Sequence, residues 1–398
     1  MFRVAIKMLV GDRGKYAGLI FGIAFTSFLV TYAACFFTGF MTRAFSLISE
    51  NPDTDVWVMD PTVSSVEQTT NIPASALDRV RSVAGVRFAT PLALGTAEVR
   101  FPNGRFQSFQ VIGVDDGSLV GAPALPEDRS ARALRVRDAA IVAEGGTDGK
   151  LLMPELKADQ WPADGPHLEV PTRLIATGDE VEVNEHRVIV AGVADALPRF
   201  PPRCLLYTPL SKASQILLPE RHRLTFVLAS VVPGTDPAAV AARIERQTGL
   251  RARTADDFKK DTVLWYLVNC EDVGDVTTML VLAITVGFGV TGVMLYMFTQ
   301  DSLKHYAVLK AMGATPRMLA VMILAQAGTS TLVGTGIGLG ACGVASLFAG
   351  KLFDMPFRMM WFTPLAGLVS VVVVGLVAAA VSMRPVFKLE PATVFGGR

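Results

Sequence analysis

Few residues of this chain combine the type and the spacing that catalysis or cofactor binding requires. Residues 145–150, GGTDGK, approach the glycine-rich loop that holds nucleotide phosphates, but Glu144 replaces its first glycine and Leu151 replaces its Ser or Thr. The sequence also lacks the G-x-S-x-G turn of a serine nucleophile. No metal-ligand spacing relates the four histidines, His167, His186, His222 and His305. The sequence therefore predicts a non-catalytic chain that holds no metal and no cofactor of its own.

The elements that position the remaining residues are strongly apolar. Four stretches contain no Asp, Glu, Lys, Arg or His: residues 16–42, 276–300, 318–350 and 359–383. Each exceeds the roughly 20 residues that a helix needs to cross a bilayer, and helices are expected because lipid offers no partner for free backbone groups. Four buried helices of a soluble core are the weaker alternative. The first stretch is too long for the core of a signal peptide, so we interpret it as a retained anchor.

The composition fits a membrane protein. Apolar residues make up 51% of the chain and charged residues only 18%, which is low for a soluble protein. The formal net charge of +1 gives no indication of a nucleic-acid partner. Basic residues gather before the first stretch, between the second and third, and after the fourth, which predicts that both termini are cytoplasmic.

The predicted fold is an α-helical membrane protein with four transmembrane helices and a mixed α/β extracytoplasmic domain between helices 1 and 2. The expected segments are a cytoplasmic amphipathic segment (1–15), helix 1 (16–42), the extracytoplasmic domain (43–275, two lobes, the inserted lobe at about 121–215), helix 2 (276–300), a cytoplasmic loop (301–317), helix 3 (318–350), a short outer loop (351–358), helix 4 (359–383) and a cytoplasmic tail (384–398).

The extracytoplasmic domain carries clear strand, turn and capping signals. Pro102-Asn103-Gly104 and Asn184-Glu185 are expected at hairpin turns. The expected strands are residues 54–60 and 224–232, the expected helices are residues 73–86 and 236–249, and residues 203–217 are expected as a strand running into a helix. Residues 255–300 are expected as one long helix into the second span. Cys204 and Cys270 could pair outside the cell, although unpaired thiols are the preferred interpretation.

The spans favour close helix packing and no ion coupling. Small residues four apart let helix backbones approach, and three such pairs occur: Gly18/Gly22, Gly334/Gly338 and Gly336/Gly340. Ordinary membrane-helix composition would also explain them. Ion-driven transporters generally need ionisable residues at depth. Because the spans have none, any energy source is expected on a partner.

Residues 304–319, KHYAVLKAMGATPRML, form a short basic segment between the second and third stretches. Gly313 suits the position after a helix end. Thr315 suits a new N-cap, and Pro316 suits the first position of the next helix. The segment is therefore either a rigid docking element or a plain turn whose charge sets topology.

The same segment closely resembles the cytoplasmic coupling loop of FtsX-like, MacB-type ABC transporter permeases, of the type VII ABC superfamily. The order of one helix, a large outer domain and three helices is also similar, and the tail RPVFKLEPATVF resembles the DevC-like branch. The sequence departs at residues 304–310, KHYAVLK, where many members have Arg-Glu. The resemblance implies that the ATPase-coupling residues are Tyr306, Leu309, Lys310, Met312, Gly313, Ala314, Thr315 and Pro316.

The resemblance also implies partners and a mechanism. The expected assembly is a homodimer or paired permease in the bacterial inner membrane, among membrane lipids, with a cytoplasmic ABC ATPase dimer that holds ATP and Mg²⁺. ATP hydrolysis would move the extracytoplasmic domain (mechanotransmission) and export a lipid, lipoprotein, glycolipid or drug-like substrate, with a periplasmic adaptor protein and an outer-membrane channel in some systems. Two alternatives are a signalling subunit that activates an envelope enzyme such as a peptidoglycan hydrolase, and a membrane-tethered binding protein without an ATPase.

Overall fold

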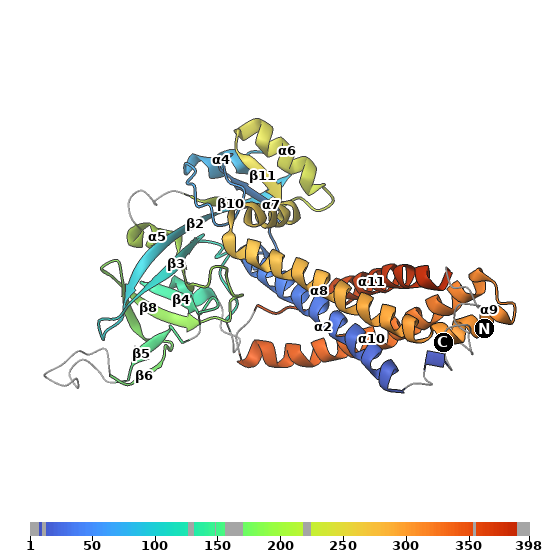
Figure 1. Ribbon diagram of the computed structural model, residues 1–398. Helices are drawn as coiled ribbons and strands as arrows, with labels where there is room; N and C mark the ends of the chain where they lie inside the picture. The colour runs from blue at the N-terminus through green and yellow to red at the C-terminus, as the bar shows by residue number, and fades with distance from the viewer. Residues whose placement is uncertain are drawn as a thin grey trace. The chain divides into compact units, whose positions relative to one another are not determined.

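The chain forms two compact units in the structure, a computed structural model that describes residues 8–9, 13–125, 131–147, 149–155, 170–217, 224–352 and 356–387 (Figure 1). One unit comprises the described residues of Met1–Phe40 and Glu271–Arg398, and the other is Met41–Cys270. We call them the membrane unit and the outer unit. Most of the expected amphipathic segment 1–15, most of the tail 384–398 and part of the loop 351–358 lie outside the described residues.

The membrane unit is helical. Its helices are α2 (Arg13–Ala44), α8 (Glu271–Asp301), α9 (Leu303–Ala311), α10 (Pro316–Leu352) and α11 (Phe362–Phe387). Within the described residues, α2, α8, α10 and α11 are long and apolar enough to cross a membrane. Helix α11 packs against both α8 and α10 (Figure 1). The four-helix prediction is therefore confirmed.

Buried hydroxyl side chains make several of the contacts between helices of the membrane unit. Thr26 of α2 lies 3.0 Å from the Thr291 hydroxyl of α8 and donates to the Gly287 carbonyl at 3.1 Å. Ser27 donates to the Thr335 carbonyl of α10 at 3.3 Å. All of these hydroxyl-bearing side chains are buried. Small polar contacts thus join the helices in place of charged groups, as is common between helices in lipid.

An ion pair lies at one end of this bundle. Lys15, near the start of α2, lies 3.2 Å from Asp301 at the end of α8. At the opposite end of α2, the Arg358 amide donates to the Cys35 carbonyl at 3.2 Å. The start of α2 and the end of α8 therefore lie at the same end of the membrane unit, as two antiparallel spans require.

The outer unit begins with the short helix α3 (Ser46–Ser49) and contains a βαββαβ half. This half, which we call the ferredoxin-like half, is made of β1 (Val56–Met59), α4 (Ser75–Arg81), β2 (Val86–Arg100), β10 (Phe226–Val231), α6 (Pro237–Thr248) and β11 (Arg251–Thr254). Its antiparallel strand order is β11-β1-β10-β2. Helices α4 and α6 cover one face, where Val56 and Val58 are buried, while Trp57 and Met59 point into a core on the other face. This alternation is the ordinary period-two pattern of a strand buried on both sides.

The other half of the outer unit is a closed barrel inserted between β2 and β10. Its further elements are β3 (Phe106–Val114), η1 (Ala131–Arg135), β4 (Ala139–Ala143), β7 (Glu180–Val183), β8 (His186–Val193), β9 (Cys204–Pro209) and α5 (Leu210–Ile216). The strands follow the order β2-β3-β9-β4-β8-β7, and β7 then pairs back with the far end of β2. A separate two-stranded sheet consists of β5 (Leu152–Pro154) and β6 (Thr172–Leu174). Apolar side chains such as Phe109, Val111 and Val188 fill the barrel interior.

The local signals of the outer unit were predicted well. The turn at 102–104 joins β2 and β3, and Gly104 has φ +85°. Asn184 and Glu185 both have positive φ, +44° and +66°, as a two-residue hairpin loop with matching twist requires. The Asp236 side chain accepts from the Ala238 amide at 3.1 Å and caps α6.

Two predictions that the sequence suggested about the outer unit and its connection to α8 were wrong. The inserted lobe begins before residue 121, because the barrel already includes the end of β2 and all of β3. Residues 255–300 do not form one helix. Helix α7 (Ala255–Asn269) ends before Cys270, which is extended at φ −113° and ψ 119°. Glu271 and Asp272 then occupy the first turn of α8, where acidic side chains favour a new helix start.

Candidate coupling site

Helix α9 ends in a defined backbone motif. Gly313 has φ +95°, a left-handed conformation that glycine adopts without cost. The Ala314 amide donates to the Leu309 carbonyl at 3.0 Å, and the Gly313 amide donates to the Lys310 carbonyl at 3.1 Å. These two bonds form a Schellman motif, which satisfies carbonyls that the helix end would otherwise leave unpaired.

The next helix, α10, starts three residues after Gly313. Pro316 is the first residue of α10, and the Met318 amide donates to the Thr315 hydroxyl at 3.4 Å. Pro316 loses nothing by lacking an N–H at this position. Because both helix ends are capped, the angle between α9 and α10 is fixed by residues 313–316.

The inner side of α9 is bound to the membrane unit through Tyr306. This residue is fully buried and packs with Leu319 and Ile323 of α10 and Val386 of α11. Its hydroxyl donates to Gln326 Oε1 at 2.7 Å. Burial raises the pKa of Tyr306 to about 12, so the hydroxyl remains a donor at neutral pH.

The outer side of the segment presents a small apolar surface. Met312 is 72% exposed and Val308 is 42% exposed. Gly313, Thr315 and Pro316 are exposed beside them. We call these five residues the coupling face. An exposed apolar surface at the tip of a rigid turn is suited to a protein partner.

The structure places four of the expected coupling residues in buried or partly buried positions. Tyr306 lies inside, and the half-buried Leu309 and Ala314 pack against the same buried cluster, so these residues hold α9 in place. Lys310 is partly buried. Sequence reasoning missed Val308, although its spacing of four from Met312 places both on one side of a helix.

Comparison with known proteins assigns the chain to a family. The pattern of the MacB-like periplasmic core domain matches residues 17–247, more than half of the chain, and that of the FtsX-like permease C-terminal region matches residues 277–391. The chain belongs to the FtsX-like, MacB-type ABC transporter permeases. The resemblance seen in the sequence is thereby confirmed.

Individual relatives of the permease match over shorter spans. Uncharacterised ABC transporter permeases of Mycobacterium tuberculosis (strain H37Rv) and Mycobacterium bovis are each 30% identical over 126 residues. Each match covers 31% of this chain and 34% of the relative, so the permease spans about a third of the length of these proteins.

Two solved structures similar to part of the permease are an extracellular and a periplasmic domain. The periplasmic region of MacB from Actinobacillus actinomycetemcomitans has 14% identity and a TM-score of 0.33, covering 53% of this chain and 92% of that chain. The extracellular domain of the noncanonic ABC-type transporter YknZ from Gram-positive bacteria has 12% identity and a TM-score of 0.32, covering 50% of this chain and 98% of that chain.

The six glycines expected at helix contacts of the permease divide into two groups. A Cβ on Gly334 would lie 2.7 Å from Ile23, and one on Gly338 would lie 2.6 Å from Ser27, so both glycines let α10 approach α2. Gly22 faces Met294 of α8, with 3.0 Å between a Cβ and its Cγ. Among the described residues, no heavy atom lies within 4 Å of a Cβ on any of the others, Gly18, Gly336 and Gly340.

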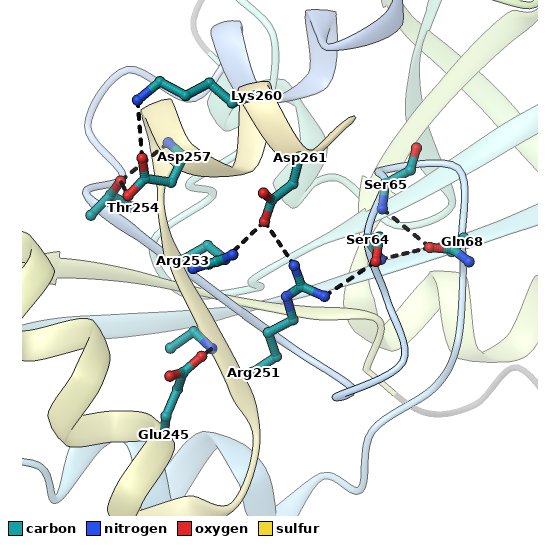
Figure 2. A network of polar contacts seen from close by, with 11 residues as sticks. Ser64, Ser65, Gln68, Glu245, Arg251, Arg253, Thr254, Asp257, Lys260 and Asp261 are labelled. Carbon is teal, nitrogen blue, oxygen red and sulfur yellow. Dashed lines mark hydrogen bonds and ion pairs between the residues drawn. The ribbon is translucent and has the colours of Figure 1, made fainter. Parts of the chain in front are cut away.

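A polar network binds α7, the helix before α8, to the ferredoxin-like half (Figure 2). Asp261 of α7 accepts from Arg251 and Arg253 of β11, both at 2.8 Å. Arg251 also donates to the Ser64 hydroxyl at 3.2 Å. Thr254 caps the start of α7 by accepting from the Asp257 amide at 3.2 Å. Movement of α7 is therefore tied to β11.

Two negative findings concern the part of the permease that the structure describes. No group of three His, Cys, Asp or Glu side chains there could hold a metal ion. Cys204 and Cys270, both in that part, form no disulfide. Cys204 is buried in β9, where its sulfur lies 3.0 Å from the Thr147 hydroxyl.

Proposed function

We propose that this permease passes force from a separate cytoplasmic ATPase to its outer unit, and that this movement exports a lipid, lipoprotein, glycolipid or drug-like substrate. The ATPase holds ATP and Mg²⁺, and two permease copies sit above an ATPase dimer in the bacterial inner membrane, with both termini in the cytoplasm. A periplasmic adaptor protein and an outer-membrane channel would continue the route where they are present.

The observation that carries the proposal is the construction of the coupling site. Met312 and Val308 are exposed on one side of α9, while Tyr306 is buried on the other. The Schellman motif at Gly313 and the cap at Thr315 hold the angle to α10. A segment that must both bind a partner and transmit its movement needs an exposed anchor and a rigid base, and this segment has both.

The membrane interior supports a mechanical role. Among the residues that the structure describes, the buried polar side chains of the spans are hydroxyls and the Gln326 amide, and the apolar stretches contain no Asp, Glu, Lys, Arg or His. Proton- or ion-driven transport generally uses such residues at depth. An external ATPase is therefore the more suitable source of energy.

The test is a pair of substitutions on the coupling face, Met312→Asp and Val308→Asp. Each places a charge in the centre of the proposed interface, and loss of a central apolar anchor typically costs about 2 kcal/mol, or roughly 30-fold in Kd. Phe106→Asp, at a 62% exposed apolar side chain of the barrel, is the matched control.

The variants are purified in nanodiscs, and copurifying ATPase and ATP turnover are measured. We expect both to fall in the coupling-face variants and to stay at the wild-type level in the Phe106 control. Wild-type amounts of ATPase on folded Met312→Asp and Val308→Asp proteins would show that the segment is only a turn. An envelope hydrolase that copurifies and is activated by ATP would instead identify the signalling function.

A further inference from the structure

The segment that leaves the first membrane helix is held by a buried arginine of the barrel. Arg199 lies in the loop between β8 and β9, and its guanidinium donates to the Ser46 hydroxyl at 2.8 Å and to Glu50 Oε2 at 2.5 Å. Ser46 opens α3, and Glu50 follows its end, directly after α2 in the chain. One loop of the barrel thus binds the chain where it enters the outer unit.

Neighbouring groups make further hydrogen bonds to Arg199 and Glu50. The Tyr207 hydroxyl of β9 accepts from Arg199 at 3.0 Å and donates to Glu50 Oε2 at 2.9 Å. The other Glu50 oxygen accepts from the Leu197 amide at 2.7 Å. The Arg199 amide donates to the Gly145 carbonyl at 2.9 Å, which fixes the loop against the turn after β4. Both Glu50 oxygens and both terminal nitrogens of Arg199 are therefore used.

This loop also contacts the segment that leads into the second membrane helix. The Tyr266 hydroxyl of α7 donates to the Phe200 carbonyl at 2.8 Å, and the two rings lie 5.7 Å apart. Arg203, at the end of the loop, pairs with Glu67 at 2.7 Å. Residues 197–203, which we call the β8–β9 loop, therefore contact both connecting segments of the outer unit: the one that follows α2 and the one that precedes α8.

The contact is more buried than a typical surface ion pair. The Arg199 side chain is 5% exposed and the Glu50 side chain is 14% exposed, whereas Arg187 and Glu180, another pair of the same barrel, are 64% and 52% exposed. Among the described residues, no group accepts a hydrogen bond from Arg199 Nε. Burying an ion pair with an unsatisfied donor is a costly way to gain stability alone, since apolar residues often serve as well.

The ferredoxin-like half is connected differently. Its strand β11 runs directly into α7 and holds it through Arg251, Arg253 and Asp261 (Figure 2). The barrel has no such direct continuation into α3 or α7, since it begins and ends at β2 and β10. Displacement of α3 relative to α7 would therefore reach the barrel through the β8–β9 loop, alongside the apolar core that Leu47 and Ile48 of α3 share with the barrel.

We propose that the β8–β9 loop is the joint that passes movement of the membrane helices to the barrel, with Arg199 as its positioning residue. This inference rests on the proposed function, because it assumes that ATP hydrolysis moves α2 and α8. It assigns the barrel the role of the moving arm and the ferredoxin-like half the role of the base that follows α7.

The test measures movement between the two halves of the outer unit. Spin labels are placed at Gln247 on α6 and Ser108 on β3, both exposed, in a Cys270→Ser background of the permease with its copurifying ATPase in nanodiscs. The distance distribution is recorded without nucleotide and after trapping with Mg-ATP and vanadate. Labelled permease is diluted with unlabelled permease, so that distances within one chain dominate.

Three variants and one control are compared with the wild type. Arg199→Met removes the charge, Glu50→Gln keeps the shape and most hydrogen bonds, and the swapped pair Glu50→Arg with Arg199→Glu restores opposite charges. Arg187→Met removes the exposed barrel ion pair and is the matched control. Glu50→Gln keeps the test decisive if Arg199→Met fails to fold.

We expect an ATP-dependent shift of the label distance in the wild type and in Arg187→Met. We expect at least half of the shift to be lost in Arg199→Met and Glu50→Gln, while ATP turnover continues, and to return in part in the swapped pair. A full shift in folded Arg199→Met or Glu50→Gln protein would overturn the joint while leaving the proposed function intact. A wild type with ATPase bound but no shift would overturn both.

Discussion

At the scale of single residues, Gly313 determines how α10 leaves the coupling site. Its φ of +95° lies in the left-handed region, yet a Cβ there would meet no heavy atom of the described residues within 4 Å. Replacing Gly313 by another residue would therefore cost free energy through backbone strain and not through a steric clash. This torsion is therefore one of the features that set the angle between α9 and α10.

Gly313→Ala should weaken coupling through that torsion. A left-handed non-glycine residue costs about 1–2 kcal/mol, and β-branched Val should cost more. We expect lower ATP turnover by the permease–ATPase complex, with Val below Ala. Gly234→Ala is the control, because Gly234 also has a positive φ, +87°, and open space but lies in the outer unit. Equal turnover in all three variants would mean that the angle does not matter.

Tyr306 offers a second residue-scale prediction. Tyr306→Phe keeps the ring among Leu319 and Val386 but removes the hydroxyl that donates to Gln326. Loss of a buried hydrogen-bond partner typically costs about 1–3 kcal/mol. We expect a lower melting temperature of the membrane unit and faster proteolysis at residues 312–315. Tyr296→Phe, at a 43% exposed tyrosine of α8, should change neither.

Local chemistry explains which of these residues the sequence identified. Gly313, Thr315 and Pro316 were correctly placed at a helix end and a helix start, because capping depends on a few adjacent residues. The direction of Tyr306 could not be read in the same way. It depends on α10 and α11, whose position relative to α9 is a tertiary property.

At the scale of elements, the glycine pairs of α10 show that a spacing of four residues does not by itself predict a helix contact. Gly334 and Gly338 lie on the side that meets α2, while Gly336 and Gly340, with the same spacing, meet nothing described within 4 Å. The sequence showed two equivalent pairs. Only the packed bundle distinguishes them.

Valine substitutions should separate these two sides. In Gly338→Val, the added Cβ would lie 2.5 Å from the Ala24 carbonyl oxygen, so α2 and α10 must move apart. Overpacking of this kind typically costs about 1–3 kcal/mol. We expect a lower melting temperature in detergent for Gly338→Val and little change for Gly336→Val. A strong effect of Gly336→Val alone would indicate a contact with a second chain.

The outer unit illustrates the same limit for strands. The hairpins at 102–104 and 184–185 were predicted, since their turns are set by neighbouring residues. Closure of the barrel was not predicted, because it depends on β7 meeting β2 through pairs such as Val99 with Val183, far apart in sequence. The break at Cys270 was missed because no proline or glycine marks it.

At the scale of the whole molecule, the basic residues beside the four spans predict which positions face each side of the membrane. Thr315 in the coupling face and Ser82 after α4 are both exposed in the structure. Cysteines at the two positions, in a Cys270→Ser background, should therefore differ in reactivity only because a membrane separates them. We expect an impermeant maleimide added outside spheroplasts to label Ser82→Cys and not Thr315→Cys. External labelling of Thr315→Cys in sealed cells would reverse the proposed orientation.

The barrel enters and leaves the ferredoxin-like half at a single place. The Leu94 amide of β2 donates to the Thr225 hydroxyl beside β10 at 2.9 Å. Strands β2 and β10 are already antiparallel partners there, with Leu92 opposite Phe226. An insertion whose two ends touch leaves the order of the host strands unchanged. The segment between β2 and β10 could therefore change in length without altering the strand order of the ferredoxin-like half.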